Sequence, residues 1–273
     1  MLATLAAAAV LAVVTPASPP VTIAVVDTGV APLAAFGNRL APGIDLVGGS
    51  PTARDPNGHG TAMAAAAAAA DPARGVVGGC PRCRILPVVA IGASGSGSTS
   101  TVAEGVAWAA AHGARVILVA STCDSDDPSL DAAIAAASAA GATVVVAAGN
   151  GASSDPSQHG FPAAAAPEAI TVGAALGTAL APWSNHGSWV DVAAPGVRPT
   201  LGANGARLTA EGTSAAAAYV AGLVGQMVSR NPSLQPADVQ AILLAAGTGE
   251  TGLDVRSGRV LDPAAALRAA AAA

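Results

Sequence analysis

Four residues of types that can do chemistry stand at the ends of apolar runs or at the starts of alanine-rich stretches. Asp27 and Asn150 each follow an apolar run closely, while His59 and Ser214 each open an alanine-rich stretch. A serine hydroxyl is a weak nucleophile that needs a base, a histidine can serve as that base, and a carboxylate orients the histidine. An amide donor stabilises the oxyanion that forms during attack on a carbonyl. The four residue types together therefore predict acyl-transfer chemistry.

Each of the four residues has a predicted role. We expect Ser214 to be the nucleophile, His59 the general base and Asp27 the carboxylate that orients His59. Asn150 and the backbone amide of Ser214 are expected to form the oxyanion hole. The positive end of a helix disfavours a protonated imidazole, which would keep His59 available as a base.

The elements that must position these residues alternate along the chain. Short apolar runs without period-two alternation predict buried parallel strands at Val21–Val26, Ile85–Ile91, Val116–Ala120, Thr143–Ala148, Ala169–Val172 and Val190–Ala193. Alanine-rich stretches predict helices at Thr61–Ala70, Thr101–His112, Ser129–Ala140, Ser214–Arg230 and Pro236–Ala246. This order predicts an α/β three-layer sandwich, with a mainly parallel sheet flanked by helices. Ligands of such sheets bind beyond the carboxyl ends of the strands, where the four residues would lie.

The motifs resemble those of the subtilisin-type serine peptidases, the subtilase family. The matching strings are Val-Val-Asp-Thr-Gly-Val around Asp27, Gly-His-Gly-Thr around His59, Ala-Ala-Gly-Asn ending at Asn150 and Gly-Thr-Ser ending at Ser214. The order Asp, His, Ser is that of the family. The resemblance covers roughly residues 21–267 and extends to variants seen in actinobacterial mycosins. It implies a subtilisin-like fold and an endopeptidase that acts on protein or peptide substrates through an acyl-enzyme.

The resemblance also implies where a substrate would bind. The expected substrate-binding residues are Gly95, Ser96, Gly97, Ser121, Thr122, Cys123, Ala147, Ala148 and Gly149. The first three form an edge that pairs with an extended substrate, and the next three form the strand on its other side. Cys123 stands where the family usually has glycine and would narrow the pocket. Asp124, just beyond this strand, suggests a preference for basic side chains in the substrate.

Three departures from the family pattern bear on activity and metal binding. Ala215 and Ala218 replace the methionine and the proline that usually follow the nucleophile. The usual calcium loop is replaced by residues 70–75, which contain one carboxylate. Because calcium prefers six or more oxygen ligands, this loop is not expected to bind it; a structural calcium elsewhere stays an open alternative, no metal ligand is assigned, and no cofactor is required. The departures leave open a second class of function, a catalytically weak or inactive subtilase-like protein that binds peptides.

Composition excludes other classes of function. The chain has 273 residues, of which 52% are hydrophobic and 11% charged, so it has ample material for a core. A net charge of -5 with no basic run argues against nucleic-acid binding. Residues 1–17 resemble a signal peptide, which predicts a secreted or cell-envelope protein whose single catalytic domain spans residues 18–273. No stable membrane span is expected in the mature chain, and a monomer is the default.

The remaining polar features are expected to be structural. Cys80 and Cys83 predict a local turn or a small disulfide loop, with a redox motif as the alternative. His112, His159 and His186 lack partner motifs. The acidic run Asp124, Asp126, Asp127 and Asp131 is expected to be a solvated face that includes a helix N-cap. The alanine-rich tail after Leu267 is expected to fray.

Overall fold

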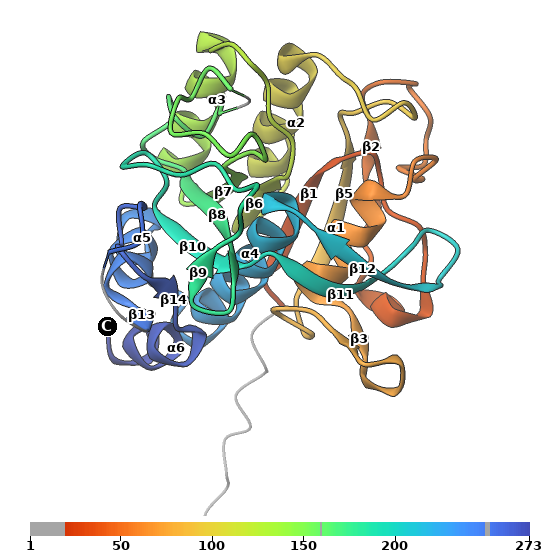
Figure 1. Ribbon diagram of the computed structural model, residues 1–273. Coiled ribbons are helices and arrows are strands. Elements are labelled where there is room, and N and C mark those ends of the chain that lie inside the picture. Colours follow the sequence, from red (N-terminus) through yellow and green to blue (C-terminus); the bar gives the residue numbers. More distant parts are fainter. Residues whose placement is uncertain (1–19, 159, 249–251) are drawn as a thin grey trace, which may run out of the picture.

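The protein is built around one large sheet, seen in a computed structural model that describes residues 20–158, 160–248 and 252–273 (Figure 1). The sheet has ten strands, in the order β13-β14-β10-β8-β7-β6-β1-β5-β2, with β9 paired to β8. All neighbours are parallel except β13 with β14 and β8 with β9. The predicted signal peptide, residues 1–17, lies outside the described residues.

The strands of the sheet are β1 (Thr22–Asp27), β2 (Ile44–Asp45), β5 (Arg84–Val89), β6 (Val116–Val119), β7 (Thr143–Ala147), β8 (Ile170–Leu176), β9 (Ala179–Leu180), β10 (Val192–Pro195), β13 (Gly247–Thr248) and β14 (Val260–Leu261). Two separate hairpins pair β3 (Ala70–Asp71) with β4 (Val76–Val77), and β11 (Val197–Leu201) with β12 (Arg207–Glu211). The short 3-10 helices are η1 (Ala34–Arg39) and η2 (Pro72–Arg74).

Helices cover both faces of the sheet. They are α1 (His59–Ala68), α2 (Thr99–Ala111), α3 (Pro128–Ala139), α4 (Thr213–Arg230), α5 (Pro236–Ala245) and α6 (Pro263–Ala272). Helices α2 and α3 lie on one face, and α1, α4, α5 and α6 on the other (Figure 1). In β1 the side chains alternate between the two layers: Ile23 and Val25 pack toward α1 and α4, and Ala24 and Val26 toward α2. The three-layer α/β sandwich predicted from the sequence is confirmed.

Helices α1 and α4 approach each other unusually closely. A side chain at Gly222 of α4 would place its Cβ 2.4 Å from the carbonyl oxygen of Ala67 in α1. The facing residues are almost all alanine or glycine, and Ala215–Ala218 are fully buried. This contact is direct between backbones, and it joins the helix that begins with His59 to the helix that carries Ser214.

The six strands and five helices predicted from the sequence are present, with their ends shifted by a few residues. The expectation that the tail after Leu267 frays is wrong, because α6 extends to Ala272. Asp262 caps this helix by accepting hydrogen bonds from the amides of Ala264 and Ala265. Ala266 and Ala270 are fully buried on the α4 and α5 side, so packing holds a segment that composition alone suggested was loose.

Within residues 20–158, 160–248 and 252–273, no helix is both long and apolar enough to cross a bilayer. In the same ranges no group of three or more His, Cys, Asp or Glu side chains is arranged to hold a metal ion. At the expected position of the calcium loop, Asp71 pairs with Arg74 at 2.6 Å.

Candidate active site

Asp27 is the last residue of β1, at the carboxyl edge of the sheet, and its side chain is 1% exposed. Its Oδ1 accepts a hydrogen bond from the amide of Thr28 at 2.7 Å. Both carboxylate oxygens lie close to Nδ1 of His59, at 2.8 and 2.9 Å. A buried carboxylate is costly unless it is hydrogen-bonded, and this pairing satisfies that requirement.

His59 is the first residue of α1, and its side chain keeps 40% of its surface exposed to the cleft. The helix can begin here because Gly60 has no side chain: a Cβ at Gly60 would lie 2.2 Å from the carbonyl oxygen of Gly29. With Nδ1 donating its proton to Asp27, the neutral ring leaves Nε2 as an acceptor. His59 is therefore oriented to accept a proton on its cleft side.

The pKa of His59 is raised above its ordinary value of 6.5. Burial alone would lower this pKa, because it disfavours the charged imidazolium. The hydrogen bond that His59 donates to Asp27, the charge of Asp27 and the charge of Asp55 together outweigh burial and stabilise the protonated form. The pKa of His59 is thus shifted in the direction opposite to the one predicted from the helix N-terminus.

Ser214 is the second residue of α4, directly after Gly212 and Thr213. Its hydroxyl donates a hydrogen bond of 2.7 Å to the carbonyl oxygen of Ala120, at the end of β6. Among the described residues no hydrogen bond joins Ser214 to His59. The contact expected of a nucleophile and its base thus requires the hydroxyl to leave the carbonyl of Ala120. Such contacts are often loose before substrate binds.

Asn150 lies on the surface just after β7, and its amide is oriented by the chain before Ser214. Its Oδ1 accepts hydrogen bonds from the amide and the hydroxyl of Thr213, at 2.9 and 3.1 Å. The Thr213 hydroxyl in turn accepts from the amide of Gly149 at 3.1 Å. Because Oδ1 is occupied, Nδ2 is left as a free donor. Thr213 was not singled out in the sequence, although it lies inside the Gly-Thr-Ser string.

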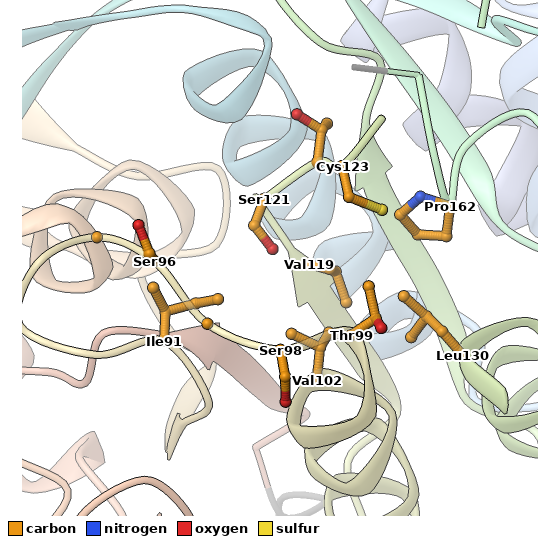
Figure 2. A pocket seen from close by; sticks show the side chains of 13 residues that line it. Ile91, Ser96, Ser98, Thr99, Val102, Val119, Ser121, Cys123, Leu130 and Pro162 are labelled. Carbon is orange, nitrogen blue, oxygen red and sulfur yellow. The ribbon is translucent and has the colours of Figure 1, made fainter. Parts of the chain in front are cut away.

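Two adjoining cavities form a cleft beside these residues. One, of about 270 Å³, is lined by Asp27 and His59 and by residues that include Gly95, Ser121 and Thr122. The other, of about 250 Å³, is shown in Figure 2. Its lining comprises Ile91, Gly95, Ser96, Gly97, Ser98, Thr99, Val102, Val119, Ser121, Thr122, Cys123, Leu130 and Pro162.

The structure brings six of the nine expected substrate-binding residues to this cleft. The loop Gly95–Gly97 lies on one side, and Ser121–Cys123 lies on the other (Figure 2). Ala147 and Ala148 are buried at the end of β7 and line neither cavity. Gly149 also lies outside both linings.

Cys123 occupies an unexpected position in the backbone network. Its amide donates to the carbonyl of Phe161 at 3.0 Å, and its own carbonyl accepts from the amide of Phe161 at 3.2 Å. Burial raises the pKa of the Cys123 thiol, and the nearby carboxylates of Asp124, Asp126 and Asp127 raise it further. The other two cysteines, Cys80 and Cys83, form a disulfide, in line with the predicted disulfide loop.

The acidic run beyond Cys123 is largely accounted for by helix α3. Asp127 is the N-cap of α3 and accepts a hydrogen bond of 2.9 Å from the amide of Ser129. Hydrogen bonds from Ser129 and Thr99 lower the pKa of Asp127 to about 2. Burial and the neighbouring Asp126 raise the pKa of Asp131 to about 6.

Two of the three remaining histidines have structural partners. His112 stacks on Trp108, with the ring centroids 3.8 Å apart. His186 lies 2.6 Å from the carboxylate of Asp254. Neither lines the cleft, and His159 lies outside the described residues.

Comparison with known families decides the assignment of the chain. Residues 19–259 match the Subtilase family. The chain belongs to this family. The predicted resemblance is confirmed, and most of the matched segment lies within the part of the subtilase chain that the structure describes.

Named relatives of this subtilase are proteases. It is 33% identical over 236 residues to the M-protease of Shouchella clausii, covering 85% of this chain and 61% of the relative. It is 38% identical over 233 residues to the thermophilic serine proteinase of Bacillus sp. strain AK1, covering 83% and 57%. Subtilisin Savinase of Lederbergia lenta is 32% identical, with 85% and 86% covered. The chain thus spans about three fifths of the length of the first two relatives.

Solved structures share the subtilase fold. MycP1 with its N-terminal propeptide removed superimposes with a TM-score of 0.78 at 32% identity, covering 92% of both chains. A cold-adapted subtilisin-like serine proteinase gives a TM-score of 0.75 at 30% identity, covering 84% of this chain and 83% of the other. The subtilisin-like fold and the expected likeness to mycosins are confirmed.

Proposed function

We propose that this subtilase is a serine endopeptidase with Asp27, His59 and Ser214 as its catalytic triad. The observation that carries the proposal is the pairing of His59 Nδ1 with both oxygens of the buried Asp27, which leaves Nε2 as the acceptor of a side chain that lines the cleft. Membership of the subtilase family supports the same reaction. No metal or cofactor takes part in the proposed chemistry.

The proposed reaction begins when substrate enters and the Ser214 hydroxyl leaves the carbonyl of Ala120. His59 Nε2 accepts the hydroxyl proton while Oγ attacks the carbonyl carbon of the scissile peptide bond. Asn150 Nδ2 and the amide of Ser214 donate hydrogen bonds to the oxyanion. His59 then gives its proton to the leaving amine as the C–N bond breaks. Water attacks the resulting acyl-enzyme while His59 accepts a proton from it, and His59 returns that proton to Ser214 Oγ as the ester bond breaks and the acid product leaves.

The proposed substrate is an extended protein segment lying between Gly95–Gly97 and Ser121–Thr122. In an extended strand, the amide and the carbonyl of one residue point to the same side. The amide and the carbonyl of Cys123 are both already bonded to Phe161. A substrate therefore pairs with Ser121 and with the opposite loop rather than with Cys123. Val102, Val119 and Leu130 line the cavity in Figure 2 and suit an apolar side chain.

A preference for basic side chains near Asp124 is a separate part of the proposal. A library of peptides that varies each position around the scissile bond measures it. Enrichment of arginine or lysine at one position supports the role of Asp124. Equal cleavage with and without basic residues at every position contradicts it.

The proposed location is outside the cytoplasm, with residues 18–273 acting as one catalytic domain and as a monomer. The predicted signal peptide and the Cys80–Cys83 disulfide support export, because disulfides persist in oxidising compartments. Expression with the complete N-terminus in a bacterial host measures both points. We expect the processed protein outside the cytoplasm and a monomeric mass on size-exclusion chromatography with light scattering.

The proposed reaction is tested by labelling with a fluorophosphonate and by hydrolysis of casein in parallel. The wild-type protein should label and hydrolyse, while Ser214→Ala should do neither. His59→Ala should lose about three orders of magnitude or more in rate. Absence of labelling in a folded wild-type protein would instead favour the inactive, peptide-binding alternative.

A further inference from the structure

Asp55 lies in the loop before α1 and is the most heavily hydrogen-bonded carboxylate next to the active site. Its Oδ1 accepts from the amides of Asn57 and Gly58 at 3.0 and 2.7 Å. Its Oδ2 accepts from the amide and the hydroxyl of Thr61 at 2.8 and 2.6 Å. These contacts hold the turn on both sides of His59.

A further contact links this turn to the strand that carries Asp27. The hydroxyl of Thr28 donates to Asp55 Oδ1 at 2.8 Å and accepts from the amide of Gly60 at 3.0 Å. The Thr61 hydroxyl, held by Asp55, accepts from the amide of Ala31 at 2.9 Å. Thr28 and Thr61 are buried, so these bonds are shielded from water. Asp55 therefore connects the residue after Asp27 with the first turn of α1.

We propose that Asp55 is a positioning residue that sets the geometry of the Asp27–His59 pair by joining the end of β1 to the start of α1. The proposal rests on the proposed peptidase function and extends it to a residue outside the triad. Asp55 touches neither the reacting atoms nor the cleft cavities that contain the triad carboxylate and base. It acts through the placement of Asp27 and His59.

The charge of Asp55 gives this role a distinct signature. The carboxylates that raise the pKa of His59 are Asp27, from β1, and Asp55, from the loop before α1. The other residues that line the cavity around the imidazole are uncharged. Removing the charge of Asp55 should therefore lower the pKa of His59, whereas a purely structural loss would reduce the amount of folded protein without moving that pKa.

The test compares Asp55→Asn with Asp45→Asn. Asp45 is a matched control, because it also accepts backbone amides of a loop, those of Val47 and Gly48, but lines neither cavity of the cleft. For the folded fraction of each protein, kcat/KM for a peptide substrate is measured across pH. We expect kcat/KM of Asp55→Asn to fall at least about tenfold and the acid limb of its pH profile to move to lower pH. The pH profile of Asp45→Asn should match that of the wild type.

A titration by NMR makes the test independent of turnover. The imidazole pKa of His59 is measured in protein with labelled histidine, and the signal is assigned by its absence in His59→Ala. A lower pKa in Asp55→Asn than in Asp45→Asn supports the proposal. If Asp55→Asn has the wild-type pKa of His59 and the wild-type kcat/KM, the proposal is overturned. It is also overturned if the loss of rate in Asp55→Asn disappears once the rate is divided by the fraction of folded protein.

Two further variants cover other outcomes. Thr28→Val keeps the shape of the side chain and removes only the hydroxyl that bridges Asp55 to Gly60. If Asp55→Asn does not fold, a wild-type kcat/KM in Thr28→Val overturns the proposal. Asp55→Glu keeps the charge but moves it, so its rate should fall while the pKa of His59 stays raised. If the wild-type protein does not turn over, the peptidase proposal fails, and the titration still decides whether Asp55 acts on His59.

Discussion

Two of the side chains proposed for catalysis, His59 and Asn150, are each held by a neighbour that leaves one functional atom free. Asp27 holds Nδ1 of His59, and Thr213 holds Oδ1 of Asn150. Ser214 is held by Ala120 in a direction that substrate binding must change. The types of these residues were predictable from short motifs. Their hydrogen-bond partners were only partly so, because Ala120 is 94 residues away from Ser214 in the sequence.

The raised pKa of His59 predicts the acid side of the pH profile. The general base must be neutral, so kcat/KM falls as pH drops through the pKa of His59. Since this pKa is raised above 6.5, the midpoint of the acid limb should lie above pH 6.5. Steady-state kinetics of a peptide substrate between pH 4 and 9 measures it. In Asp27→Asn the residual activity should show a lower midpoint, and a wild-type midpoint at or below 6.5 contradicts the prediction.

Gly60→Ala is predicted to destabilise the start of α1. The added Cβ would lie 2.2 Å from the carbonyl oxygen of Gly29, and a backbone atom cannot move aside as a side chain can. We expect a loss of about 1–3 kcal/mol in the free energy of unfolding, with lower activity. Gly202→Ala is the matched control, because its Cβ would first meet the flexible end of Leu208 at 3.0 Å. Equal urea midpoints for the two variants would show that the first turn tolerates a side chain.

At the level of elements, segments whose apolar pattern reflects burial were predictable, and segments held by distant partners were not. The hairpin of β11 and β12 contains exposed polar residues, and Pro199 lies inside β11, so its sequence gives no clear strand pattern. Helix α6 was misjudged for a related reason. Its alanines have no amphipathic pattern, and only the neighbouring α4 and α5 show which of them are buried.

Helix α6 is predicted to contribute to stability through its buried alanines. Ala266→Gln places a long polar side chain in a fully buried position and should cost about 1–3 kcal/mol of unfolding free energy. Ala264→Gln, at an exposed position of the same helix, should change stability by less than about 0.5 kcal/mol. Urea unfolding followed by circular dichroism measures both. If both variants match the wild type, α6 is not packed as described.

The Cys80–Cys83 disulfide is predicted to stabilise the connection between β4 and β5. Closing so short a loop should contribute about 2 kcal/mol by restricting the unfolded chain. The double variant Cys80→Ser, Cys83→Ser should therefore unfold at lower urea, and a reducing agent should have the same effect on the wild type. Cys123→Ser serves as the control for thiol loss without loss of a disulfide. Identical midpoints in all three proteins would assign the disulfide no stabilising role.

At the scale of the whole molecule, the sequence predicted the fold, and it also indicated the triad proposed here, because both depend on local signals along the chain. Strand ends, glycine turns and helix starts lie beside Asp27, His59 and Ser214 in the sequence. The role of Asp55 was missed, since an aspartate in a loop has no motif of its own and its hydroxyl partner, Thr28, is 27 residues away. The pairing of Cys123 with Phe161 was missed because it joins two irregular segments by an isolated bridge.

The contact between α1 and α4 leaves little compressible space between the helices that carry His59 and Ser214. With Gly222 against the carbonyl of Ala67, the two backbones already touch, and alanine methyl groups fill what remains. Hydrostatic pressure acts on proteins through internal voids, and this interface has few to lose. The separation of the base and the nucleophile should thus resist compression. Under pressure, catalysis should fail by global unfolding rather than by gradual drift of its geometry.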